Sequence, residues 1–264
     1  MRARPTRVTR AQSHPAFRAV HQFTVLTLRR SQLHQGVLVG LSACGAGFAI
    51  TGLIDANLGA PSSTGEAASS ALVSAAVWTP FALMFVCGVA VRAALALPME
   101  YRANWIFRFS EVDEAARREQ MRAVDRIATT YVAGVPVAAS IPILWTVLGP
   151  TGLVAGVVVA LVGVVFVHAV LLDWRRIPFT CSYLPGKRFI GYGVLLGLAA
   201  FWLVTLTGAA LAHAAIGSVG QALAIAAALS VAATVLRRRR LAAWRNTPLA
   251  FEDEFPDQPL QLGL

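Results

Sequence analysis

Charged residues are scarce in this sequence. Aspartate, glutamate, lysine and arginine make up 14% of the 264 residues, whereas hydrophobic residues make up 56% and the mean hydropathy is +0.62. An ordinary soluble domain carries about 25% charged residues, so this composition argues against that class. It indicates a membrane protein instead.

Lysine and cysteine are scarce as well. All but one of the 23 basic residues are arginine, and the only lysine is Lys187. The three cysteines, Cys44, Cys87 and Cys181, make an odd number without CxxC spacing, and the first two fall in apolar stretches. This pattern indicates neither a disulfide framework nor a zinc site. We therefore expect no metal and no cofactor.

No acidic residue lies near the middle of an apolar stretch. An ionisable residue is expensive to hold inside a membrane, so a buried carboxylate is a mark of transport coupled to protons or sodium. Its absence argues against that class of transporter. Two other ionisable residues lie near the ends of apolar stretches. We expect Arg92 to reach the membrane surface and His168 to be hydrogen-bonded inside the bundle.

Six apolar stretches are long enough to cross a membrane. Each has about 19–27 residues, and a helix of roughly 20 residues spans a hydrocarbon core of ~30 Å. The sequence therefore predicts an all-α, polytopic bundle of transmembrane helices. The predicted spans are residues 36–54, 71–97, 130–149, 151–172, 189–212 and 216–236.

Basic residues alternate between the two sides of these spans. Loops 98–129 and 173–188 and both ends of the chain carry all the arginines except Arg92, whereas loop 55–70 has no basic residue. The positive-inside rule then places both termini in the cytoplasm. It also explains the net charge of +10 without a nucleic-acid partner. We divide the chain into a basic cytoplasmic arm (1–35), a six-span domain (36–236) and a polybasic, then acidic, cytoplasmic tail (237–264).

The end of the basic arm has the pattern of an amphipathic helix. From Phe17 to Leu33, the apolar residues Val20, Val25 and Leu28 alternate with polar ones. A helix of this kind lies on a membrane surface with its apolar face in the lipid. We predict that location for it.

Small residues and prolines are expected to shape the packing of the spans. Closely spaced glycine and alanine residues allow helix backbones to approach, and proline interrupts helical hydrogen bonding. We expect the small residues to pack within the bundle, although a face between copies of the chain is the alternative. The pairs and prolines concerned are Gly36/Gly40, Ala43/Gly47, Gly152/Gly156/Ala160 and Gly193/Gly197, with Pro80, Pro136 and Pro142 as expected kinks.

Loop 98–129 begins with an aromatic segment. Tyr101, Trp105 and Phe109 recur every four residues, which predicts an interfacial helix with its aromatic face in the headgroups. A second helix is expected from Ser110 through Ile127. The loop is either an amphipathic connector or a docking surface for a cytoplasmic partner. The candidate docking residues are Tyr101, Arg102, Asn104, Trp105 and Arg108.

The most unusual chemistry lies in the segment from Trp174 to Arg188, between the fourth and fifth spans. Its likeness to a phosphatase loop and to a P-loop is weak, because key residues of each motif are absent. We predict a rigid loop that packs against the interfacial helix and attracts anionic lipid headgroups through its basic residues. The candidate functional residues are Arg175, Arg176, Cys181, Tyr183 and Lys187.

The two loops together resemble a known family. The residues concerned are Leu97-Pro98, Arg102-Ala-Asn-Trp105, Phe107-Arg108 and Ile177-Pro-Phe-Thr-Cys-Ser-Tyr-Leu-Pro-Gly-Lys187. They resemble a family of bacterial multi-spanning membrane proteins, over roughly residues 70–190. The resemblance implies a bacterial inner-membrane location and brings no assigned activity. Members of that family can be longer at the N-terminus, which would make this chain the C-terminal part of such a protein.

Two functions remain open from the sequence. The first is a non-enzymatic membrane component of an export or transport assembly. This chain has no complete P-loop, so ATP-driven work would need a cytoplasmic or membrane partner such as an ATPase. The alternative is a membrane-embedded enzyme that acts on a lipid-linked substrate at the cytoplasmic face, with Cys181, Tyr183 and Lys187 at its site.

Overall fold

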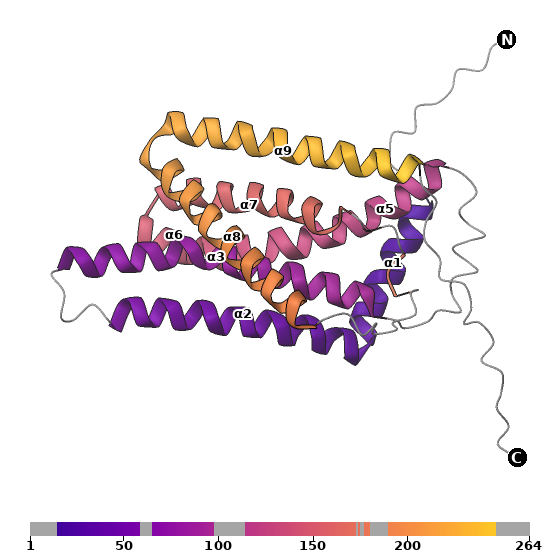
Figure 1. Cartoon of the computed structure of the whole chain (residues 1–264), viewed down its shortest axis with the longest axis horizontal. Helices are drawn as coiled ribbons and strands as arrows, with labels where there is room; N and C mark the ends of the chain where they lie inside the picture. The colour runs from indigo at the N-terminus through magenta and orange to yellow at the C-terminus, as the bar shows by residue number, and fades with distance from the viewer. Residues whose placement is uncertain are drawn as a thin grey trace, which may run out of the picture.

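The computed structural model describes residues 15–58, 65–97, 114–172, 174, 177–179 and 190–246. All the regular elements within these ranges are helical (Figure 1). This confirms the predicted all-α fold. In chain order the elements are α1 (Pro15–Arg30), α2 (Gln32–Leu58), α3 (Gly65–Ala96), α5 (Glu114–Thr129), the π-helical turn η2 (Thr130–Gly134), α6 (Val135–Leu148), α7 (Thr151–Val170), α8 (Ile190–Gly217) and α9 (Val219–Asn246).

Six helical segments are long and apolar enough to cross a membrane. They match the six predicted spans in number and order, so the chain is an integral, multi-pass membrane protein. The segments are Gln32–Leu58, Ser70–Ala96, Ala115–Leu148, Thr151–Val170, Leu195–Gly217 and Val219–Ala243.

The third span differs from its prediction. We expected a helix through Ile127 and then a separate span at 130–149, but α5 continues through η2 into α6 without leaving the helical conformation. The π turn ends two residues before Pro136, whose ring nitrogen has no hydrogen to donate. A π turn is a common local adjustment within a long helix. Pro80 and Pro142, in contrast, lie inside α3 and α6 with no change of helix type.

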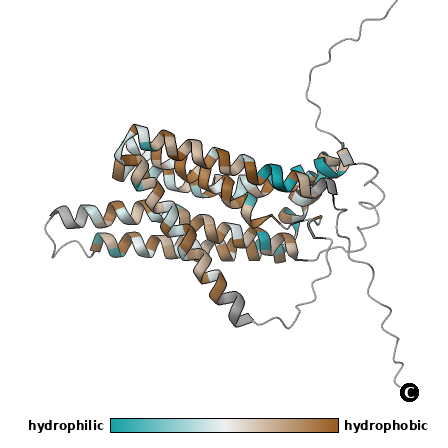
Figure 2. Cartoon of the chain, turned by 45° about the horizontal axis from the view of Figure 1, so that its top comes forward, coloured by the Kyte–Doolittle hydropathy of each residue, from teal (hydrophilic) through white to brown (hydrophobic). Residues whose placement is uncertain are grey.

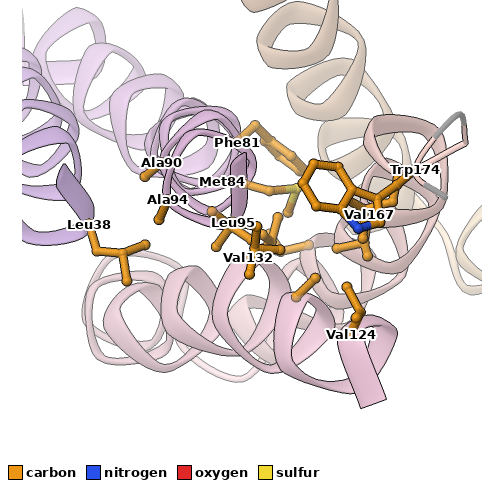
Figure 3. Packing of buried hydrophobic residues seen from close by; sticks show 14 of the residues in the cluster. Leu38, Phe81, Met84, Ala90, Ala94, Leu95, Val124, Val132, Val167 and Trp174 are labelled. Carbon is orange, nitrogen blue, oxygen red and sulfur yellow. The ribbon is translucent and has the colours of Figure 1, made fainter. Parts of the chain in front are cut away.

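Helix α3 lies at the centre of the bundle. It contacts α2, α6, α7 and α8, and 61% of its apolar window is buried, the largest share of any span. Phe81 and Met84 of α3 are fully buried, and Figure 3 shows them among side chains from α5, η2 and α7. Helix α9 is at the other extreme. It lies along the outside of α7, and none of its apolar window is buried (Figure 1).

The predicted small-residue contacts are confirmed on α7 and not on α2. A Cβ atom at Gly152 would lie 2.4 Å from the carbonyl oxygen of Leu144, so α6 and α7 approach closely there. Gly156 has ordinary contact distance to Ile141. Around Gly36 and Gly40, in contrast, a Cβ atom would have no neighbour within 4 Å. These α2 glycines therefore face outward.

The predicted amphipathic helix near the N-terminus is confirmed as α1. Its buried side faces protein, because α1 contacts α5 and Val20 is fully buried. Thr24 and Thr27 are buried beside it, and the Thr24 hydroxyl donates a hydrogen bond to the Val20 carbonyl. The location of α1 at a membrane surface stays a prediction.

Candidate functional site

The residues that the sequence singled out as candidate sites lie outside the described residues. These are Tyr101, Arg102, Asn104, Trp105 and Arg108 of the second loop, and Arg175, Arg176, Cys181, Tyr183 and Lys187 of the third. The predicted contact between the two loops is therefore untested. Of the third loop, the structure describes Trp174, Ile177, Pro178 and Phe179.

Basic residues gather at one end of the bundle. Helix α1, the first half of α5 and the last turns of α9 meet there (Figure 1), and hydrophilic residues collect at the same end in Figure 2. We call this the arginine-rich end. Its exposed arginines include Arg18, Arg29 and Arg30 of α1, Arg122 and Arg126 of α5, and Arg237, Arg238 and Arg239 of α9.

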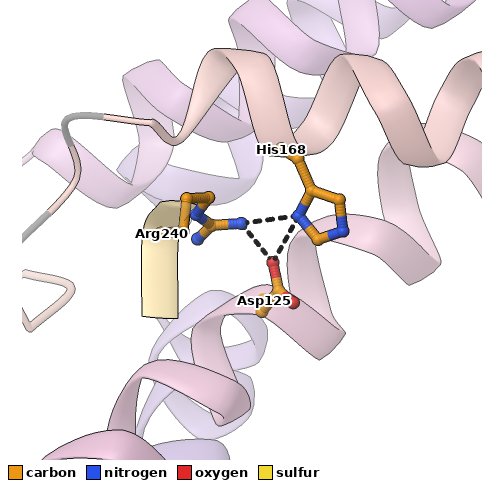
Figure 4. A network of polar contacts seen from close by, with 3 residues as sticks. All are labelled: Asp125, His168 and Arg240. Carbon is orange, nitrogen blue, oxygen red and sulfur yellow. Dashed lines mark hydrogen bonds and ion pairs between the residues drawn. The ribbon is translucent and has the colours of Figure 1, made fainter. Parts of the chain in front are cut away.

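A buried polar network joins three helices at this end (Figure 4). Nη1 of Arg240, on α9, lies 2.5 Å from Oδ1 of Asp125, on α5, and 2.9 Å from Nδ1 of His168, on α7. The His168 and Asp125 atoms are 3.5 Å apart. One guanidinium group therefore contacts both other side chains and connects α9 to α5 and α7.

His168 contacts both charged groups through one ring nitrogen. Its Nδ1 lies 2.9 Å from Nη1 of Arg240, which can only donate, and 3.5 Å from Oδ1 of Asp125, which accepts. This confirms the expectation that His168 is hydrogen-bonded within the bundle.

Burial makes the Asp125–Arg240 ion pair necessary. The Arg240 side chain is 2% exposed and that of Asp125 is 20% exposed. A charge removed from water to this extent needs a partner, because its desolvation costs several kcal/mol. Asp125 supplies the opposite charge, and His168 adds a polar contact to the same guanidinium group.

Sequence reasoning missed the role of Arg240. We explained the run Arg237–Arg240 by helix orientation alone, but Arg240 is buried whereas its three neighbours are exposed. The helical spacing of the residues on α9 indicated that Arg240 is buried. Ile225, Leu229 and Leu236 form one half-buried stripe on α9, and Arg240 follows Leu236 by one turn on the same face.

Arg92 has a partner that the sequence did not predict. The expected extension of its side chain to the membrane surface stays a prediction, and its Nη1 donates a hydrogen bond to the carbonyl oxygen of Val170. Val170 is the last residue of α7, where carbonyl groups have no intrahelical donor. Arg92 of α3 therefore caps the C-terminus of α7.

The start of the third loop is anchored in the core. Ile177 and Phe179 are fully buried, and Trp174 is 8% exposed. The Phe179 amide donates to the carbonyl oxygen of Leu95, at 3.2 Å. Its ring meets that of His34 edge to face, with 4.7 Å between the centroids. Phe179 has a φ of +66°, a left-handed conformation that is unfavourable for a residue with a side chain.

His34 links the first two spans beside this anchor. Its Nε2 lies 3.2 Å from the carbonyl oxygen of Leu97, which only accepts, so Nε2 is the donor. Its Nδ1 lies 2.6 Å from the Ser31 hydroxyl. His34 is 1% exposed. Its polar atoms thus hold the start of α2 against the end of α3.

These polar groups connect helices to one another. Asp125, His168 and Arg240 join α5, α7 and α9, while Arg92 and His34 join neighbouring spans. Among the described residues, no group of three or more histidine, cysteine, aspartate or glutamate side chains is placed to hold a metal ion. No family model, no curated protein and no solved structure matches this chain.

Proposed function

We propose that this protein is a non-enzymatic membrane component of an export or transport assembly in the bacterial inner membrane. In this proposal the arginine-rich end faces the cytoplasm, as the positive-inside rule requires. The observation that supports it is the difference in burial among the four consecutive arginines at the end of α9. Arg240 is buried and paired with Asp125, whereas Arg237, Arg238 and Arg239 are exposed.

This difference in burial favours a docking surface for a partner over a role in membrane orientation alone. Orientation requires basic residues near the end of a span and no fixed structure for them. Here the Arg240–Asp125 pair holds the last turns of α9 against α5, so the three exposed arginines stand on a fixed helix. A surface that is already ordered loses less entropy when a partner binds. An acidic surface on a cytoplasmic ATPase is the partner chemistry that fits.

The polar groups of the arginine-rich end support a structural role over a catalytic one. Asp125, His168 and Arg240 contact one another within 3.5 Å. A catalytic group needs to reach a substrate and to change its protonation during the reaction. A guanidinium group held between a carboxylate and an imidazole serves packing better than proton transfer.

Site-specific photo-crosslinking in living cells tests the proposed docking surface. A benzoylphenylalanine placed at Arg238 is expected to give an adduct with one discrete protein, because that side chain is exposed at the arginine-rich end. The matched control is the same residue at Leu223, which is 68% exposed on the apolar part of the same helix. It should give no protein adduct. Adducts at position 238 that contain only lipid would contradict a protein partner and favour headgroup attraction.

A further inference from the structure

An apolar crevice lies between α2, α3 and α8. It has a volume of about 480 Å³, within the range of roughly 300–1,000 Å³ usual for ligand sites. Phe48 of α2 and Trp202 of α8 are among its lining residues and are 51% and 52% exposed, so the crevice opens outward. None of the lining residues is charged. Apart from main chain, their only polar groups are the Cys44 thiol and the Trp202 indole N–H.

Aromatic rings join the walls of the crevice. The Phe201 ring of α8 meets Phe48 of α2 and Phe85 of α3 edge to face, with centroid distances of 5.8 and 5.5 Å. Edge-to-face pairs at this distance are favourable beyond the apolar area that they bury. The ring of Phe201 thus connects all three walls, and the crevice is preformed.

The position of the crevice along α2 and α8 indicates which part of the bilayer surrounds it. At 1.5 Å per residue, Cys44 lies roughly 18 Å along α2 from Gln32, and Phe201 lies roughly 16 Å along α8 from Ile190. Half of a bilayer core is about 15 Å thick. The crevice therefore opens near the middle of the membrane, where the ends of lipid chains are found and headgroups do not reach.

The shape of the crevice favours a thin occupant over a helix from a second copy. Its lining residues lie within 44–48, 82–86 and 197–202, which is little more than one turn of each helix. One turn rises about 5.4 Å, so the crevice is too short to receive the several turns over which two helices pack. A flexible hydrocarbon chain enters such a space from the side without polar groups that need partners.

We propose that this crevice binds the end of one acyl chain of a bilayer phospholipid. The chain inserts between α2 and α8 and packs against Phe85 on α3, which forms the floor. Because all the lining residues lie far from the membrane surface, the site selects for chain length and is indifferent to the headgroup. This site is separate from the arginine-rich end and does not depend on the proposed docking of a partner.

Gly197 provides a variant that closes the crevice. It lines the crevice, and a Cβ atom added to it would have no neighbour within 4 Å. Gly197→Leu is therefore expected to fill the space without a clash. The matched control is Gly220→Leu on α9, where an added Cβ atom is equally unopposed and which does not line the crevice. Cys44→Leu fills the crevice from the opposite wall and serves if Gly197→Leu is unstable.

The test uses a long-chain phosphatidylglycerol with a photoreactive diazirine near the end of one chain. The full-length protein is reconstituted with it in vesicles of short-chain phosphatidylcholine, irradiated and analysed by peptide mass spectrometry. We expect labels on residues 44–48, 82–86 and 197–202 of the unmodified protein and of Gly220→Leu. Labelling there should fall several-fold in Gly197→Leu relative to labelling around Leu223. Unlabelled long-chain phosphatidylcholine should compete, and a short-chain form should not.

Three results would overturn the proposal. The first is equal labelling of the crevice in all variants, which would indicate general contact with lipid. The second is competition by the phosphatidylglycerol headgroup whatever the chain length. The third is a crevice that stays unlabelled while residues around Leu223 are labelled, since a lipid chain would then not be its occupant.

Discussion

Replacing Asp125 with leucine is expected to lower the free energy of unfolding by about 3–5 kcal/mol. The change leaves Arg240 with its charge in a site where the side chain is 2% exposed. Removing one partner of a buried ion pair costs this much, because the remaining charge has neither water nor a counter-ion. The measurement is an equilibrium unfolding curve of the purified protein in a mild detergent.

Replacing Arg240, alone and together with Asp125, separates the energy of the ion pair from the effects of the two single substitutions. Arg240→Met is expected to cost less than Asp125→Leu, because the Asp125 side chain is 20% exposed and water can reach it. The double variant should recover most of the loss, since apolar side chains of similar volume often replace a buried ion pair without penalty. Arg239→Met, at the exposed neighbour on α9, should change stability by at most about 0.5 kcal/mol. Equal losses for Arg239→Met and Arg240→Met would contradict the network.

Replacing Phe179 with alanine is expected to cost about 3–5 kcal/mol, the usual effect of removing a buried phenyl ring. The ring is fully buried and packs against His34 and Phe23. Phe179→Gly removes the ring as well, but glycine adopts a φ of +66° without strain. The glycine variant should therefore be more stable than the alanine variant by about 1–2 kcal/mol. Thermal unfolding of both variants in the same detergent measures the difference.

A control in the same loop distinguishes an anchor from a catalytic site. If the third loop is structural, Cys181→Ser should preserve both stability and function, while Phe179→Ala lowers stability. A Cys181→Ser protein that is stable and inactive would favour the enzymatic alternative. A Phe179→Ala protein as stable as the unmodified one would show that the loop is not anchored through this ring.

The spans were predictable because a membrane crossing requires a continuous apolar run. Each of the six runs is visible in the sequence without knowledge of its neighbours, and each corresponds to a helix long enough to cross. The start of the third span was not predictable in this way. The polar helix α5 continues into the apolar helix α6 through a π turn. A change in hydropathy along the sequence shows where the surroundings of a helix change, and it does not show where the helix begins or ends.

The polar network was harder to predict because its members are far apart in the chain. Arg240 and Asp125 are 115 residues apart, and each is unremarkable in its own segment. The choice of Arg240 over Arg239 depends on which face of α9 meets α7 and α5. The half-buried stripe through Leu229 and Leu236 indicates Arg240, but its partner on α5 becomes evident only when the helices are placed together.

The orientation of the bundle is the claim on which the proposed function depends most. The most direct measurement is labelling of single introduced cysteines in intact cells with a maleimide that does not cross membranes. Ser218→Cys, between α8 and α9, should be labelled from outside, because this turn lies at the end of α9 away from Arg240. Arg122→Cys, exposed on α5 at the arginine-rich end, should be labelled only after the cells are permeabilised. Labelling of Arg122→Cys in intact cells, with Ser218→Cys protected, would contradict a cytoplasmic docking surface.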